Sequence, residues 1–139
     1  MYLLDTNVIS ELRKVKSGRA NEGVVAWSQT VTTAELYLSV ITVQELELGV
    51  LLKERRDLQQ GAVLRKWLDG QVLPAFAGRI LPITLEIARR TANLNVPQQR
   101  AFYDSLIAAT ALEHGYTLVT RNEADMQGTG VEIVNPFQS

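Results

Sequence analysis

The sequence contains no cysteine and only one histidine among its 139 residues. The lack of cysteine excludes a disulfide scaffold, a thiolate zinc site and a cysteine nucleophile, and a single histidine excludes any site that needs two. There is also little excess of charge, because 14 Lys and Arg residues face 15 Asp and Glu residues. Since nucleic-acid-binding domains are usually strongly basic, the charge total gives no sign of a nucleic-acid partner.

Long apolar runs and targeting signals are missing as well. No segment approaches the roughly 18 apolar residues of a membrane span. The opening Met-Tyr-Leu-Leu-Asp has neither the basic region nor the long apolar stretch of a signal peptide. Neither glycine-rich phosphate-binding pattern, GxxxxGK[ST] or GxGxxG, occurs. With 46% hydrophobic and 21% charged residues, the composition is that of a globular protein. We therefore expect one soluble, cytoplasmic domain over residues 1–139 with no membrane contact.

Short apolar runs alternate with helical patterns along the chain. The runs predict strands at 2–4, 36–40, 79–83, 116–119 and 131–134. Helical spacing predicts helices at 5–12, 24–29, 42–52, 58–68, 84–94 and 101–113, with a loop over 14–23 and a charged break over 53–57. This alternation is typical of an α/β fold with a central, mostly parallel sheet of four to five strands flanked by helices.

Four acidic residues fall where a predicted strand ends or the next helix begins: Asp5, Glu45, Asp104 and Asp125. In open α/β sheets, ligands bind outside the carboxyl ends of the strands. Asp104 also continues the small, apolar helix face of Ile107 and Ala108, where a carboxylate needs a partner, a shifted pKa or a metal. If the four converge, two carboxylates about 5 Å apart repel by roughly 3 kcal/mol at an effective dielectric of 20. A hard divalent cation such as Mg²⁺ or Mn²⁺ removes that repulsion.

Each acid also has a purely local explanation, and the chain holds 15 acidic residues, so spacing alone does not select these four. Asp5 can cap the helix that follows it. Glu45 can complete a capping box with Thr42. Asp104 can complement a helix dipole, and Asp125 can be an ordinary loop residue.

The densest basic cluster lies beside the exit of the first predicted strand. It consists of Arg13, Lys14, Lys16 and Arg19. Such a cluster either belongs to a solvated loop or holds the phosphate backbone of RNA. Trp27 and Trp67 lie on apolar helix faces, which is more typical of core residues than of nucleobase platforms.

Taken together, these motifs resemble the PIN-domain family, and within it the VapC-type and FitB-like toxins of bacterial toxin–antitoxin pairs. The segments that carry the resemblance are 3–8, 39–49, 73–82, 104–111, 118–125 and 135–137, in matching order and spacing. The resemblance implies a PIN-like three-layer fold and a ribonuclease that depends on Mg²⁺ or Mn²⁺.

The resemblance also assigns roles to particular residues. Asp5, Glu45 and Asp104 match the acidic positions of the family. Thr6 and Asn7 match supporting polar residues that orient metal ligands. Family members carry the fourth acid where either Asn122 or Asp125 stands here, and since Asn122 is neutral we favour Asp125, with Asn122 in support. The four acids would thus be both metal ligands and catalytic residues.

Further properties follow from the same resemblance. It implies a homodimer and a cognate VapB- or FitA-like antitoxin, which covers the acidic site and carries out DNA binding for the pair. A second hypothesis, prompted by the neutral Asn122, is a PIN-like binding module of weak catalytic activity that acts through its antitoxin. A third, a phosphotransferase related to haloacid dehalogenases, needs an aspartate at position 7, where this chain has Asn7. A bound metal ion would make the charge of an acidic pocket positive. The net charge of the whole chain therefore does not exclude RNA as a partner.

Overall fold

The computed structural model describes residues 1–137, so the last two residues of the expected domain lie outside it. Within these residues, five strands form one sheet in the order β3-β2-β1-β4-β5, and every pairing is parallel. The strands are β1 (Tyr2–Leu4), β2 (Leu36–Ser39), β3 (Ile80–Leu81), β4 (Thr117–Val119) and β5 (Ile133–Val134). The predicted α/β class and the central parallel sheet are confirmed.

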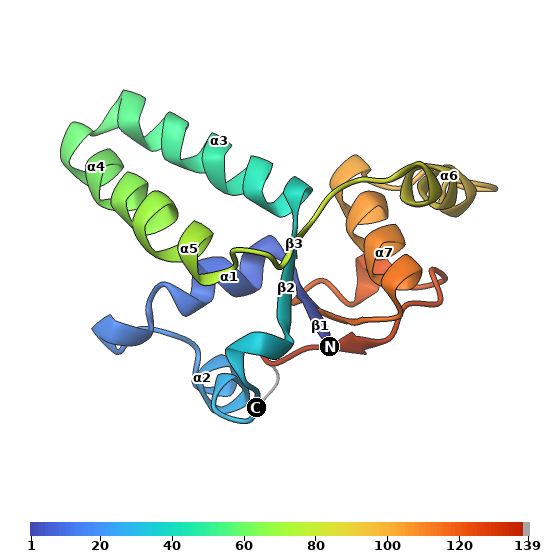
Figure 1. Ribbon diagram of the computed structural model, residues 1–139, viewed down its shortest axis with the longest axis horizontal. Coiled ribbons are helices and arrows are strands. Elements are labelled where there is room, and N and C mark those ends of the chain that lie inside the picture. Colours follow the sequence, from blue (N-terminus) through green and yellow to red (C-terminus); the bar gives the residue numbers. More distant parts are fainter. Residues whose placement is uncertain (138–139) are drawn as a thin grey trace.

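Helices cover both faces of this sheet. They are α1 (Thr6–Leu12), α2 (Glu22–Ser28), α3 (Val40–Arg56), α4 (Leu58–Trp67), α5 (Leu73–Ala75), α6 (Leu85–Leu94) and α7 (Phe102–His114). A π-helical segment over Leu68–Val72 joins α4 to α5. In Figure 1, α1 to α5 lie on one side of the strands and α6 and α7 on the other, which gives three layers. None of the helices among residues 1–137 is long and apolar enough to cross a membrane.

Alternate residues of the central strands supply the two cores. Leu4 of β1 and Val119 of β4 pack with α1, α3 and the π-helical segment. Leu3 and Leu118, one residue earlier, point to the other face and pack with α7. All four side chains are fully buried. Because successive side chains of a strand point to opposite faces, each of these strands contributes to both cores.

The strand order creates a switch point between β1 and β4. The chain starts at β1 in the middle, moves outward through β2 to β3, and then returns to form β4 on the other side of β1. Ligands of open α/β sheets bind at such a point, outside the carboxyl ends of the strands. Leu4 pairs with Val119, so the residues that follow them, Asp5 and Thr120, reach the same edge of the sheet.

The start of α3 differs from the sequence prediction. Ser39, not Thr42, is the N-cap, because its Oγ accepts a hydrogen bond from the Ile41 N–H at 3.0 Å. Thr42 is buried inside the helix, and its Oγ1 has no hydrogen-bond partner among residues 1–137. The capping-box explanation of Glu45 is therefore wrong.

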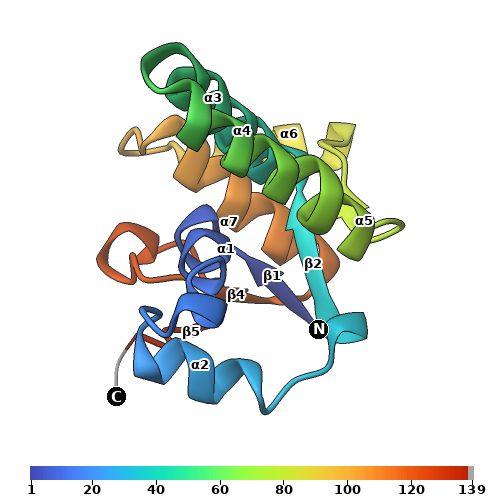
Figure 2. The same ribbon diagram turned by 90° about the vertical axis from the view of Figure 1, so that its left-hand side faces the viewer.

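The predicted charged break over 53–57 is also wrong, because α3 continues to Arg56 and turns only at Asp57. Asp57 then caps α4 by accepting a hydrogen bond from the Gln60 N–H at 3.1 Å. The charged side chains join the two helices instead, since Arg65 of α4 forms ion pairs with Glu47 at 2.6 Å and Glu54 at 3.1 Å. Figure 2 shows the resulting α3–α4 hairpin standing above α1.

The close approach of these two helices depends on Gly61. A Cβ atom at this position would lie 2.4 Å from the Cα of Glu54, so the backbone of α3 would have to move. We expect Gly61→Ala to lower the free energy of unfolding by about 1–3 kcal/mol, the usual cost of overpacking. Gly49 in α3 is the control, because a Cβ there meets nothing within 4 Å. Gly49→Ala should stabilise the chain by up to about 1 kcal/mol through helix propensity. Urea unfolding of both variants tests this, and equal effects would contradict the close packing.

Candidate active site

Asp5 lies at the switch point and is only 6% exposed. Its Oδ1 accepts a hydrogen bond from the Thr6 N–H at 2.7 Å, so it caps α1 as the local explanation predicts. Its Oδ2 accepts a second one from the Thr120 hydroxyl at 2.8 Å and a longer one from Asn7 Nδ2 at 3.4 Å. Burial raises the pKa of the Asp5 carboxyl in spite of these hydrogen bonds. Capping thus accounts for one carboxylate oxygen, and the other belongs to a network that crosses the switch point.

Thr120 is the residue of this network that sequence reasoning missed. It is fully buried, and besides donating to Asp5 its hydroxyl accepts a hydrogen bond from the Asn122 N–H at 3.0 Å. Asn7 makes a parallel connection, because its Oδ1 accepts a hydrogen bond from the Arg121 N–H at 3.1 Å. The signal in the sequence was a threonine directly after a predicted apolar strand, in the same place relative to β4 as Asp5 is to β1.

Glu45 reaches the same region from α3. It is half-buried, and its Oε1 accepts a hydrogen bond from the Thr6 hydroxyl at 2.5 Å. Thr6 therefore contacts two of the predicted site acids, Asp5 through its backbone N–H and Glu45 through its side chain. The pKa of Glu45 is raised, first by burial and then by the negative charge of Asp5.

Asp104 stands in the first turn of α7, as predicted, and is half-buried. Its carboxylate has no hydrogen-bond or ion-pair partner in the part of the chain that the structure describes. Its pKa is raised by burial and then by the charges of Asp5, Asp125 and Glu45. The helix dipole alone would lower this pKa, so a local dipole role does not explain the environment of Asp104.

Asp125 and Asn122 are both exposed on the segment that follows β4. Asp125 lies in a 3-10 turn over Ala124–Met126, and its charge contributes to the raised pKa of Asp5 and of Asp104. Its backbone oxygen accepts a long hydrogen bond of 3.5 Å from the Arg100 guanidinium. The Asn122 amide side chain makes no hydrogen bond within residues 1–137. Of the two candidates for the fourth site residue, Asp125 is thus the one that interacts electrostatically with the other acids.

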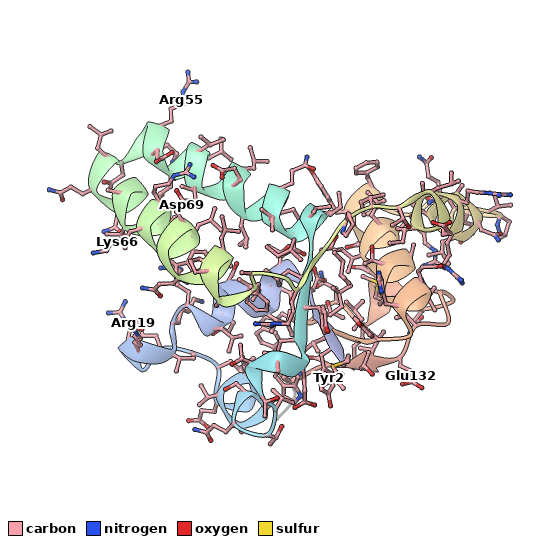
Figure 3. The ribbon with its side chains drawn as sticks, viewed as in Figure 1. Tyr2, Arg19, Arg55, Lys66, Asp69 and Glu132 are labelled. Atoms are coloured by element: carbon pink, nitrogen blue, oxygen red, sulfur yellow. The ribbon has the colours of Figure 1, made fainter. Side chains whose placement is uncertain are left out.

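The basic cluster divides in two. Arg13 lines a cavity of about 200 Å³ together with Thr6 and Glu45, and it lines a second cavity together with Lys16. Lys14 instead pairs with Glu11 at 3.3 Å. Figure 3 shows Arg19 on the outer turn of the segment between α1 and α2, and it lines neither cavity.

The four acids offer the type of ligand atom that a hard cation binds. All four offer carboxylate oxygens, which Mg²⁺ and Mn²⁺ prefer. Burial and mutual repulsion raise the pKa values of Asp5, Glu45 and Asp104. A bound cation would stabilise the charged carboxylates and so offset both effects. Within residues 1–137, however, no three Asp, Glu or His side chains as they stand are close enough together to hold a metal ion. A cation would therefore have to draw these carboxylates closer.

The chain is similar to known proteins over its full length. The chain is 38% identical to the VapC ribonuclease Y4jK of Sinorhizobium fredii and 39% identical to the toxin FitB of Neisseria gonorrhoeae, with 99% of both chains covered in each case. The crystal structure of FitAcB from Neisseria gonorrhoeae superposes with a TM-score of 0.89 at 39% identity and covers 100% of both chains. A toxin–antitoxin complex from Klebsiella pneumoniae superposes with a TM-score of 0.66 at 27% identity, covering 98% of each chain.

A protein-family model also matches most of the chain. The model of the PIN domain matches residues 2–128, which include all four acids, Thr6, Asn7 and Thr120. The three-layer fold, the match to the family model and the full-length similarity therefore lead to one assignment. The chain belongs to the PIN-domain family.

Proposed function

We propose that this protein is the toxin of a toxin–antitoxin pair and acts as a divalent-metal-dependent endoribonuclease that hydrolyses RNA phosphodiester bonds. One observation carries the proposal: at the switch point of the sheet Thr6 donates hydrogen bonds to both Asp5 and Glu45, and the charges of these two acids and of Asp125 also act on Asp104. The full-length relatives, a VapC ribonuclease and the toxin FitB, support the reaction and the biological role. The match of the PIN model over residues 2–128 supports one PIN domain over 1–139.

Each site residue has a proposed part. Asp5, Glu45, Asp104 and Asp125 would hold Mg²⁺ or Mn²⁺. When bound, such a cation lowers the pKa of a bound water and neutralises charge that develops on a phosphate. Asp5 is fixed in place by its hydrogen bonds from Thr6 and Thr120, so its carboxylate is oriented before any ligand arrives.

The supporting residues act through hydrogen bonds. The Thr6 hydroxyl donates a hydrogen bond to Glu45 and so holds that carboxylate toward α1. Asn7 and Thr120 tie the segment after β4 to the start of α1, which fixes the beginning of the segment that carries Asp125. Asn122 follows in the same segment, where its neutral amide would support a ligand rather than carry charge. Removal of the Thr120 hydroxyl should weaken metal binding without removing a ligand.

We further propose a cognate VapB- or FitA-like antitoxin as partner, a homodimeric toxin, a cytoplasmic location, and DNA binding through the antitoxin alone. The solved toxin–antitoxin complex of the same fold supports the partner. Exposed apolar side chains on the α3–α4 hairpin also support a protein contact, because large exposed apolar patches mark interaction sites. They are Leu48, Leu51, Leu52, Leu58 and Val63, each at least 50% exposed.

The experiment that tests the reaction is cleavage of single-stranded RNA by the purified chain. We expect cleavage with Mg²⁺ or Mn²⁺, none with excess chelator, and recovery when the metal is restored. A reaction that proceeds equally well in chelator would contradict the proposal. Comparison of the two metals at equal concentration shows which of them the site prefers.

The alternative function is a catalytically weak PIN-like binding module that acts through its antitoxin. The neutral Asn122 and the exposure of Asp125 favour it, because they weaken the fourth acidic position. Calorimetry with Mn²⁺ distinguishes the two functions when it is combined with the cleavage assay. For the ribonuclease we expect metal binding that is weakened in Asp104→Asn together with loss of turnover, whereas tight metal binding without turnover on any RNA would favour the module.

A further inference from the structure

Two cavities lie next to each other along α1. The first, of about 200 Å³, contains Thr6 and Glu45 of the acidic site. The second, of about 190 Å³, extends away from that site toward α5. Arg13 and Trp67 line both, so these two side chains form the wall that the cavities share. We call the second one the Trp67 cavity, and its main lining residues are Leu12, Arg13, Lys16, Trp67, Val72 and Phe76.

The Trp67 cavity combines an aromatic ring with positive charge. Its only charged lining residues are Arg13 and Lys16, and no acidic side chain lines it within residues 1–137. Neither cation forms an ion pair in that part of the chain, and the Arg13 guanidinium lies 5.9 Å from the centre of the Trp67 ring. Trp67 is half-buried and packs partly on the core, which holds its ring in place.

We propose that the Trp67 cavity is a subsite for one base of single-stranded RNA, next to the phosphate that is cleaved. This inference rests on the proposed ribonuclease function. The base would stack on Trp67 in place of the Arg13 guanidinium, which lies over that ring in the free chain, and Arg13 and Lys16 would then hold the neighbouring phosphates. Proteins that bind single strands combine aromatic stacking platforms with cationic grooves in this way. The cavity is smaller than the roughly 300–1,000 Å³ of sites for drug-sized ligands, which suits a single base.

Charge complementarity favours RNA over a protein segment as the occupant. An apolar helix of a partner would fit the aliphatic wall of Leu12, Val72 and Phe76, but it would leave two unpaired cations at the rim. A phosphate backbone neutralises both of them. The two cavities share Arg13 and Trp67 as lining residues, and the first also contains Glu45, so the base subsite adjoins the acidic site, as a substrate strand requires.

The first test compares Trp67→Leu, which keeps apolar bulk but cannot stack, with Trp67→Phe, which keeps an aromatic ring. Loss of one stacking contact weakens single-strand binding by about 5- to 150-fold. We expect Trp67→Leu to raise the KM for RNA cleavage within that range with little change in kcat, and Trp67→Phe to restore most of the loss. Trp27→Phe is the control, because Trp27 packs edge-on against Tyr2 and lines neither cavity. An unchanged KM in Trp67→Leu would overturn the proposal.

The second test does not need catalysis, so it separates this inference from the proposed function. In Trp27→Phe the only tryptophan is Trp67. We expect an uncleavable 2′-O-methyl oligonucleotide to quench its fluorescence in chelator, with the same midpoint as binding followed by anisotropy. Binding without quenching, or protection of Trp67 by a co-purified antitoxin but not by RNA, would show that RNA does not use the cavity. Quenching without cleavage at any metal concentration would contradict the ribonuclease and leave the subsite standing.

The third test uses the divided basic cluster. Each phosphate contact with a single strand contributes about 0.7 to the slope of log affinity against log salt. We expect Arg13→Ala and Lys16→Ala to reduce this slope by about that amount each. Lys14→Ala and Arg19→Ala are matched controls that should leave it unchanged, since neither residue lines the cavity. If all four variants reduce the slope equally, the loop binds RNA as a diffuse charge and the defined subsite is wrong.

Discussion

Asp5→Asn should lower the rate of metal-dependent RNA cleavage by at least about 10³-fold. The substitution keeps the shape of the side chain but removes the charge of the most buried acid of the site, which is 6% exposed. The loss corresponds to several kcal/mol of transition-state stabilisation, which is typical of metal-assisted catalysis. Initial rates on a single-stranded RNA at saturating Mn²⁺ measure it.

The control for this prediction neutralises an acid at the opposite edge of the sheet. Glu132 precedes β5 and is exposed, so it lies at the amino end of the strands rather than at the carboxyl end. We expect Glu132→Gln to cleave at the rate of the wild-type chain. If Asp5→Asn retains more than about a tenth of the wild-type rate while remaining folded, Asp5 is a helix cap and no more.

Asp104→Asn should raise the melting temperature of the metal-free protein while reducing its stabilisation by Mn²⁺. The carboxylate of Asp104 is half-buried, lacks a hydrogen-bond partner within residues 1–137, and is repelled by Asp5, Asp125 and Glu45. Because solvent screens a half-exposed group, we expect a gain of only about 1 kcal/mol at pH 7. For a chain of this size that is about 2–4 °C. Thermal unfolding in chelator and in Mn²⁺ measures both effects.

The pH dependence of this gain has a fixed sign. The pKa of Asp104 is raised in the folded chain. A raised folded-state pKa means that the wild-type side chain does not destabilise the fold below its unfolded-state pKa of about 3.9, where both states are protonated. The destabilisation develops as the pH rises from there through the folded-state pKa. The variant should therefore exceed the wild type in melting temperature at neutral pH and match it near pH 3.5. A lower melting temperature for Asp104→Asn at neutral pH would show that Asp104 is chiefly structural.

Part of the fold and part of the candidate site can be predicted directly from the sequence. The short apolar runs predict the buried strands that the structure has at Tyr2–Leu4 and Thr117–Val119. Asp5 follows the first of them and so lies at the carboxyl edge of the sheet, where parallel strands end together. Asp104 was recognisable as a site candidate because a carboxylate on a small, apolar helix face needs a partner, a shifted pKa or a metal. The roles of the acids as metal ligands stay predictions.

Other features depend on competition between local alternatives, or on contacts between distant segments, which a sequence does not reveal. Thr42 and Ser39 are both good caps, and Ser39 prevails because β2 ends there, which buries Thr42 inside the helix. Thr120 was missed because a threonine is a common strand residue, and its link to Asp5 spans 115 positions. The division of the basic cluster depends on where α4 returns against α1, since this brings Trp67 beside Arg13.

Anomalous diffraction from crystals grown with Mn²⁺ tests most directly whether a divalent cation draws the acids together at the switch point. We predict an anomalous peak between the carboxylates of Asp5 and Asp104, within about 2.0–2.2 Å of oxygen atoms of both, as expected for a small hard cation. Glu45 or Asp125 should complete the set directly or through water. Well-ordered crystals at saturating Mn²⁺ that show no peak there, with both carboxylates still apart, would contradict the account.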